Sequence, residues 1–273
     1  MTVIALTSTR GAPGVTTTAL ALTLAWPRAA MLVEADVSGS SSIKAGHLRG
    51  DAEPEPNIVN LAIAHRNNAL TLDAIRDVAL ELPLNRTRLV LPGVASSIQV
   101  GSLTNDFWET LAVTLHALTR RGVDVIIDAG RRGMTAGPEP LLRSADLVAV
   151  VTRTRLDDIV SVASNVAQLR GPADVAVERL GAILVGEGSP YRAADVKKAT
   201  GLQAWASMAY DPVNADRLSG GKEILSTARL DRSPLMRSAK STVNGLQKVL
   251  DRRADLLSAP TRSEPSREES SSR

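Results

Sequence analysis

The stretch STRGAPGVTTT, residues 8–18, decides the fold because it joins a short apolar run to a segment of helical period that extends to about Ala25. At such a strand–glycine loop–helix junction, backbone N–H groups converge and the helix N-terminus adds a partial positive charge. Gly11 and Gly14 let the backbone approach an anion closely, and Thr16 stands where phosphate-binding loops place a Mg²⁺-ligating hydroxyl. Taken alone, the loop is equally consistent with a plain strand-to-helix turn capped by threonines.

Short apolar runs recur along the chain and alternate with longer segments of helical period. Runs this continuously apolar are typical of strands that are buried on both faces of a parallel sheet. The alternation therefore predicts an α/β fold: a doubly wound, mostly parallel sheet of about seven strands with helices on both faces. The expected strands contain residues 3–6, 31–33, 89–91, 125–127, 147–151, 183–185 and 204–208.

Two expected helices carry apolar residues on one face, which predicts that this face packs against the sheet. The first set is Phe107, Leu111, Leu115 and Leu118, and the second is Leu156, Ile159, Val160, Ala163, Val166 and Leu169.

No linker divides residues 1–257, so we predict a single domain there. The segment Val37–Pro56 is rich in Ser and Gly and is expected to be a functional loop, since long loops inside a domain are seldom idle. Residues 258–273 are predicted to form a disordered polar tail, because their last fifteen positions hold three Arg, three Glu and almost nothing apolar.

The composition excludes several kinds of site. The 273 residues contain no cysteine, which excludes disulfides, thiolate zinc sites, iron–sulfur clusters and a cysteine nucleophile. His47, His65 and His116 lie far apart in sequence, so no histidine metal site is expected. The net charge of +3 is too small to indicate nucleic acid by itself. Without a long apolar run or a signal-peptide layout, the protein is expected to be cytoplasmic.

Carboxylates follow two of the expected strands. The triplet Glu34-Ala35-Asp36 ends the second strand, and Asp128, followed by Ala129 and Gly130, ends the strand at 125–127. Ligands of open α/β folds bind at this edge of the sheet, where a carboxylate can hold Mg²⁺ or orient an attacking water. As alternatives, Asp128 would only cap the next turn, and Glu34 would be a solvated loop residue.

The order of these features resembles the ParA/MinD group of deviant-Walker P-loop ATPases over residues 1 to about 250. The family loop K-G-G-x-G-K-T-T corresponds to RGAPGVTT, residues 10–17, its D-x-D to residues 34–36, and its Walker B aspartate to Asp128. Later segments of the family are similar to residues 146–151, 180–185, 209–213 and 218–221.

This resemblance implies that the protein binds ATP and Mg²⁺. It places Mg²⁺ at Thr16, Asp128 and Asp36, and it gives catalytic roles to Asp36, as the water-positioning carboxylate, and to Arg10. It assigns nucleotide contacts to Gly11, Ala12, Pro13, Gly14, Val15, Thr16 and Thr17 of the loop, and to Asp211 and Pro212 beside the base.

The departures from the family pattern bear on chemistry. Val15 stands in place of the Walker lysine, Arg10 in place of the signature lysine, and Gly186 in place of an adenine-reading Asn. Losing a charge-assisted contact to the transferred phosphoryl group costs about 2–4 kcal/mol of transition-state stabilisation. The first lysine is Lys44, so a substitute cation has to be Arg10, Lys44 or a residue from a partner. We therefore expect Mg-ATP binding with weak or absent hydrolysis.

Two functions follow from the resemblance. The first is a positioning or partitioning protein that forms a homodimer around ATP and steers a cargo, with a ParB-like protein as one candidate partner. The alternative is a pseudo-ATPase scaffold that localises a pilus, secretion or cell-pole assembly, as TadZ and CpaE do. Metabolic enzymes of the same fold are disfavoured, because the chain lacks cluster cysteines, a Tyr-rich tail and the Walker lysine.

Two surfaces are candidate contacts for such a protein. One is nonspecific DNA, for which the family resemblance points to arginines such as Arg217, Arg229, Arg232 and Arg237. The other is a membrane surface reached through an amphipathic final helix. The second is less favoured, because the apolar stripe of that helix has core width and lacks a Phe or Trp anchor. The stripe consists of Val243, Leu246, Leu250 and Leu257.

Overall fold

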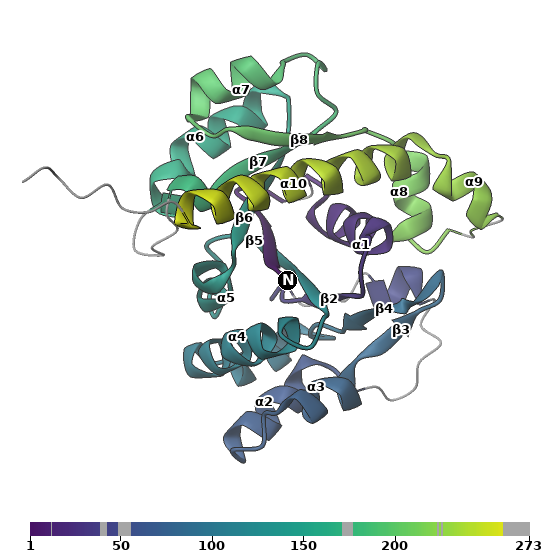
Figure 1. Ribbon diagram of the computed structural model, residues 1–273, viewed down its shortest axis with the longest axis vertical. Coiled ribbons are helices and arrows are strands. Elements are labelled where there is room, and N and C mark those ends of the chain that lie inside the picture. The colour runs from purple at the N-terminus through teal and green to yellow at the C-terminus, as the bar shows by residue number, and fades with distance from the viewer. Residues whose placement is uncertain are drawn as a thin grey trace, which may run out of the picture.

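The computed structural model describes residues 1–11, 13–38, 43–48, 56–170, 177–222, 224 and 226–258. In this part of the chain, eight strands form one sheet in the order β3-β4-β2-β5-β1-β6-β7-β8 (Figure 1). All neighbouring strands are parallel except β3 and β4. The strands are β1 (Val3–Ser8), β2 (Ala30–Glu34), β3 (Leu80–Leu82), β4 (Asn85–Leu91), β5 (Asp124–Arg131), β6 (Leu147–Arg153), β7 (Leu180–Val185) and β8 (Ala204–Met208).

Helices cover both faces of the sheet. Along β1, Val3 and Ala5 belong to one apolar cluster, whereas Ile4 and Leu6 belong to the other, because successive side chains of a strand point to opposite faces. The helices are α1 (Val15–Ala25), α2 (Ile58–Arg66), α3 (Leu72–Val78), α4 (Asn105–Thr119), α5 (Glu139–Ser144), α6 (Leu156–Arg170), α7 (Ala193–Thr200), α8 (Pro212–Leu218), α9 (Thr227–Asp231) and α10 (Pro234–Ser258), with shorter helical turns at Ile43–His47, Ser97–Ser102 and Val177–Arg179.

The two faces carry different sets of helices. Buried residues of α2 to α7 pack in the first cluster, and those of α1, α8, α9 and α10 pack in the second. The long helix α10 runs beside α1 and β8 (Figure 1). None of the helices in the described ranges combines the length and the apolar character needed to cross a bilayer.

The predicted fold class is confirmed, with one strand more than the seven expected. All seven apolar runs lie in strands, and the additional strand is β3, which forms an antiparallel hairpin with β4 at the edge of the sheet. The sequence pattern missed β3 because it has three residues and only Leu82 is fully buried.

The predicted helical faces are confirmed for α4 and only partly for α6. Phe107, Leu111 and Leu115 are buried on α4. On α6, however, Leu156 and Val160 are 61% and 53% exposed. The expectation for these two residues was wrong because α6 meets the sheet through a face centred on Ile159, Val162 and Leu169, which leaves the other side of its first turns to solvent.

The final helix packs against the body of the protein, as expected. Val243 and Leu246 are buried, and Leu250 is half-buried against the same cluster. The side chain of Leu257, the predicted tail beyond residue 258, and most of the loop expected at 37–56 lie outside the described residues.

Candidate functional site

A cavity of about 610 Å³ opens at the edge of the sheet where the central parallel strands end. Residues at or just beyond the carboxyl ends of β1, β2, β5, β6, β7 and β8 line it, together with the first turn of α1. The expected site residues that line it are Arg10, Gly11, Pro13, Gly14, Val15, Thr16, Thr17, Asp36, Asp211 and Pro212. Ala12 lies outside the described residues.

The glycine loop presents the N-terminus of α1 to this cavity. Gly14 precedes the helix with φ 103° and ψ 30°, a left-handed conformation that glycine adopts without strain. Its carbonyl accepts the first helical hydrogen bond from the Thr18 N–H at 2.9 Å. Gly14 has no side chain with which to cap the helix, and the first turn of α1 contains no acidic residue. The positive end of the helix is therefore open to an anion from the cavity.

The hydroxyl of Thr16, in the first turn of α1, lies beside the carboxyl group of Asp128 and acts to lower its pKa. Asp128 is buried on β5, and the N–H of Gly130 donates to its Oδ1 at 3.0 Å. Burial raises the pKa of Asp128 to about 6, and the neighbouring Asp36 carboxylate adds to the rise. These two donors lower the pKa without offsetting the burial. Asp128 thus interacts with neutral donors and with a second carboxylate.

Asp36 reaches the same place because residue 130 is a glycine. A Cβ on Gly130 would lie 2.2 Å from Cγ of Asp36, and Gly130 itself has φ +59°. The N–H of Ser38 donates to Asp36 Oδ1 at 2.8 Å and fixes the carboxylate from the other side. A side chain at position 130 would displace this carboxylate, so the glycine of the Asp-Ala-Gly sequence within β5 makes room for Asp36.

A hydroxyl with two carboxylates is a donor set that suits Mg²⁺, which prefers oxygen ligands and keeps several waters or phosphate oxygens. Within the described ranges, no three His, Asp or Glu residues cluster closely enough to hold a metal by themselves. Thr16, Asp36 and Asp128 thus fit a cation that takes its remaining ligands from water and from a bound phosphate.

The two carboxylates of the triplet at residues 34–36 have different environments. Asp36 lines the cavity, whereas Glu34 is buried and accepts hydrogen bonds from the N–H groups of Ile43, at 3.3 Å, and Gly93, at 3.2 Å. The alternative of a solvated Glu34 is therefore wrong. Its carboxylate anchors two segments that flank the site.

Charge at the loop is arranged differently from the family pattern. Val15 is buried and belongs to the apolar cluster that also contains Leu218 and Leu235. Arg10 is half-exposed at the mouth of the cavity, where its Nη1 lies 2.7 Å from Oδ2 of Asp157 on α6. The side chain of Lys44 lies outside the described part of the chain.

The far end of the cavity is more apolar, with Val185, Met208 and Leu235 in its wall. Asp211 caps α8 there, with Oδ1 accepting from the Asn214 N–H at 3.3 Å. Gly186 has φ +73°, and a Cβ on it would lie 3.1 Å from Cβ of Tyr210. The position where the resemblance expects an Asn is thus closed to a side chain unless Tyr210 moves.

The cavity residues that the sequence interpretation missed include Arg131, Met134 and Arg153. Arg131 and Arg153 are the last residues of β5 and β6, and the guanidinium of Arg153 lies 5.2 Å from the ring centroid of Tyr210. Their position a few residues beyond the apolar runs 125–127 and 147–151 was the available signal, because the ends of parallel strands meet at one edge.

A doubly wound sheet, with a glycine loop between its first strand and first helix and with carboxylates at the ends of two adjacent strands, defines a P-loop NTPase-like fold. In particular, it is the fold of MinD and of ParA-type ATPases. A MinD from Pyrococcus horikoshii, solved with Mg-ADP, matches 91% of this chain and 96% of its own at 16% identity, with a TM-score of 0.69. A ParA family ATPase from Chlorobium tepidum matches 89% and 98% at 14% identity, with a TM-score of 0.71.

A third structure, an ATP complex of a Cyanothece McdA variant, matches 90% of this chain and 96% of its own at 16% identity, with a TM-score of 0.65. No family model matches the sequence, and no curated protein matches it either. The likeness at these identities establishes the fold. It confirms the resemblance that the loop and the two acidic motifs indicate in the sequence.

Proposed function

We propose that this protein binds Mg-ATP and acts as a nucleotide-dependent positioning or partitioning protein of the ParA/MinD type, with weak or absent hydrolysis. The observation that carries the proposal is the meeting of Thr16, Asp36 and Asp128 below a glycine loop at a helix N-terminus. The comparisons support it, because the similar MinD structure contains Mg-ADP and the similar McdA structure contains ATP.

In this proposal the loop, residues 11–17 with Ala12 and Val15 included, holds the phosphates through its backbone and the end of α1. Thr16, Asp36 and Asp128 hold Mg²⁺, which neutralises charge on the phosphate oxygens when it is bound. The base lies at the apolar end beside Asp211 and Pro212. Without an amide at position 186, the base is held by packing more than by hydrogen bonds.

Hydrolysis is weak in this account because the cation of the loop is missing. Val15 supplies no charge to the transferred phosphoryl group, and the corresponding loss of about 2–4 kcal/mol slows the reaction by roughly 30- to 1000-fold. Asp36 positions the attacking water, and Arg10 contacts phosphate with two donors once it leaves Asp157.

Titration calorimetry of the native protein with ATP, in Mg²⁺ and in EDTA, tests the binding. We expect micromolar binding in Mg²⁺ that weakens at least tenfold in EDTA. Thr16→Val should lose this Mg²⁺ dependence. Thr110→Val, on α4 and outside the cavity lining, is the control and should retain it. Mg²⁺-independent binding in the native protein would contradict the assigned ligands.

We also propose that residues 1–257 form one unit that dimerises around the nucleotide and engages a cargo or a ParB-like protein. The solved MinC:MinD complex supports a protein partner for proteins of this fold. In sedimentation velocity, saturating Mg-ATP should convert monomer to dimer. An unchanged sedimentation profile would count decisively against the dimer.

The second candidate function is a pseudo-ATPase scaffold for a pilus, secretion or cell-pole assembly. The burial of Val15 among apolar side chains favours it, because this packing leaves the loop without its cation. A pure scaffold gives no heat with either ATP or ADP in the titration described above, so the same experiment separates the two functions.

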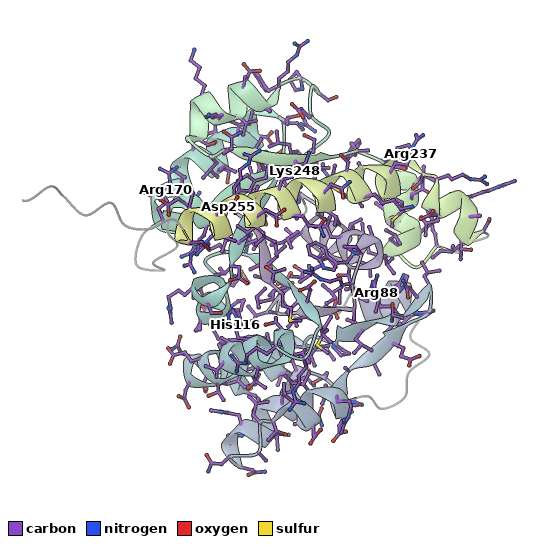
Figure 2. The ribbon with its side chains drawn as sticks, viewed as in Figure 1. Arg88, His116, Arg170, Arg237, Lys248 and Asp255 are labelled. Carbon is purple, nitrogen blue, oxygen red and sulfur yellow. The ribbon has the colours of Figure 1, made fainter. Side chains whose placement is uncertain are left out.

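DNA is a further candidate partner. Arg229, Arg232 and Arg237 are exposed at the α9–α10 end of the protein, where Figure 2 labels Arg237. If they contact phosphates, DNA affinity falls steeply with salt, and salt-insensitive retention rules the contact out. A membrane contact through α10 has less support, since Val243 and Leu246 are buried against the protein itself.

A further inference from the structure

Three arginines line the cavity, and they differ in what they contact. Arg10 pairs with Asp157 at 2.7 Å, and Arg153 lies over the ring of Tyr210. Arg131 is exposed, and its Nη2 meets only the sulfur of Met134, at 3.1 Å. Across the described ranges, no carboxylate lies within ion-pair distance of Arg131.

The backbone holds Arg131 next to the start of the glycine loop. It is the last residue of β5, and its Cα is paired in the sheet with that of Ser8, the last residue of β1. The N–H of Arg132 donates to the carbonyl of Ser8 at 2.9 Å, which fixes this register. Neighbouring strands lie about 4.8 Å apart, so a long side chain at position 131 starts within reach of the loop that follows Ser8.

We propose that the guanidinium of Arg131 binds the terminal phosphates of the nucleotide and so supports nucleotide affinity, while the contact to the transferred phosphoryl group that Val15 cannot make stays absent. This inference rests on the proposed function and names a residue for it. The guanidinium starts from the end of β5, the strand that also carries Asp128, and it can give two parallel N–H donors to one phosphate.

The contacts of the other two arginines favour this choice. Moving Arg10 to a phosphate breaks a charge-assisted hydrogen bond to Asp157, whereas Arg131 gives up a thioether sulfur, which is a weak acceptor. Arg153 belongs to the end of the cavity that carries Tyr210. Arg131 is therefore the cavity arginine that reaches a phosphate with the least loss of existing contacts.

The test is a calorimetric titration of native protein, Arg131→Gln and Arg121→Gln with Mg-ATP and with inorganic tripolyphosphate. Arg121 is an exposed arginine between α4 and β5, outside the cavity lining, so its variant controls for net charge. We expect Arg131→Gln to weaken both ligands at least tenfold, Arg131→Lys to recover part of the affinity, and Arg121→Gln to match the native protein. Circular dichroism checks that each variant is folded.

The outcomes separate this inference from the proposed function. If the native protein binds Mg-ATP and Arg131→Gln binds it equally well, the phosphate-binding role of Arg131 is wrong and the proposed function stands. If native protein binds tripolyphosphate but not ATP, and Arg131→Gln loses it, the nucleotide function is wrong and the anion site stands. If native protein binds neither ligand, both proposals are overturned.

Discussion

Strand β5 carries a buried carboxylate at each end, and the two have very different surroundings. Asp124 accepts hydrogen bonds from the N–H of Thr2 at 2.8 Å, Nε1 of Trp26 at 2.7 Å and Nε of Arg28 at 2.8 Å. Asp128 receives a hydroxyl and one N–H, with a second carboxylate beside it. Arg28 pairs with the first carboxylate, whereas no cationic side chain of the described residues forms an ion pair with the second.

This difference separates a structural role from a binding role on the same strand. A buried carboxylate with an arginine and two further donors is complete and holds its neighbours together. A buried carboxylate whose pKa is raised to about 6 is stabilised when a cation arrives from outside. Asp124 therefore has a structural role, whereas Asp128 is one of the carboxylates that we propose for the Mg²⁺ site.

The largest effect on stability is expected from Asp124→Asn. The substitution replaces one acceptor oxygen at this buried position by an amide NH₂ that meets the Trp26 and Arg28 donors, which costs about 1–3 kcal/mol of unfolding free energy because Arg28 itself is half-exposed. Urea unfolding measures the loss. Mg-ATP affinity should stay within about twofold of the native value, because the residue lies at the opposite edge of the sheet. A large change in Mg-ATP affinity would contradict the distinction between a structural role for Asp124 and a binding role for Asp128.

Asp128→Asn should have the reverse effect. It removes a proposed Mg²⁺ ligand, so we expect Mg-ATP affinity to fall about 10- to 100-fold, while the metal-free protein should be at least as stable as the native one. Calorimetry and urea unfolding at neutral pH measure the two quantities. Loss of several kcal/mol of stability in this variant would place Asp128 with Asp124 as a structural residue.

The pH dependence of stability sharpens the same point. Without metal, folded Asp128 keeps its proton up to about pH 6, whereas the unfolded chain releases it near pH 3.8. The folded state binds more protons in this window, so its contribution to stability is lost as the pH rises from about 4 to about 6. Urea unfolding across this range should show that Asp128→Asn lacks this decrease. Parallel curves for the two proteins would contradict the raised pKa.

A smaller effect is expected from Gly130→Ala, compared with Gly133→Ala. Both glycines have positive φ, +59° and +82°, so an alanine costs about 1–2 kcal/mol of backbone strain at each. Only at Gly130 does the new Cβ overlap Asp36, since nothing lies within 4 Å of a Cβ on Gly133. Gly130→Ala should therefore weaken Mg-ATP binding as well as stability. Equal binding by the two variants would exclude the role assigned to Asp36.

Much of the fold could be predicted because it depends on patterns that are local in sequence. The apolar runs of β1 and β5 and the helical face of α4 each lie in one short stretch. The short edge strand β3 and the outward turn of Leu156 and Val160 could not be predicted in this way. They depend on which neighbours the chain packs against, and the periodicity of a single segment does not contain that information.

The residues of the candidate site were likewise predictable only in part. The glycine loop, Asp36 and Asp128 were predictable because each follows an apolar run and has a distinctive residue type. The partners of Asp124 were not, because Trp26 and Arg28 are nearly a hundred positions away from it. The cavity position of Arg131 likewise depends on the pairing of β5 with β1. Without that pairing, nothing distinguishes Arg131 from the many other arginines of the sequence.

The central claim is that Mg²⁺ binding at the end of β5 persists while the loss of charge at position 15 suppresses turnover. Paired measurements of Mg-ATP binding and phosphate release, on native protein and Val15→Lys, test it most directly. We predict that both proteins bind Mg-ATP, that native protein releases phosphate at or below the detection limit, and that Val15→Lys gains turnover by at least about 30-fold. Ordinary turnover by the native protein, or binding by Val15→Lys without any gain in phosphate release, would contradict the account.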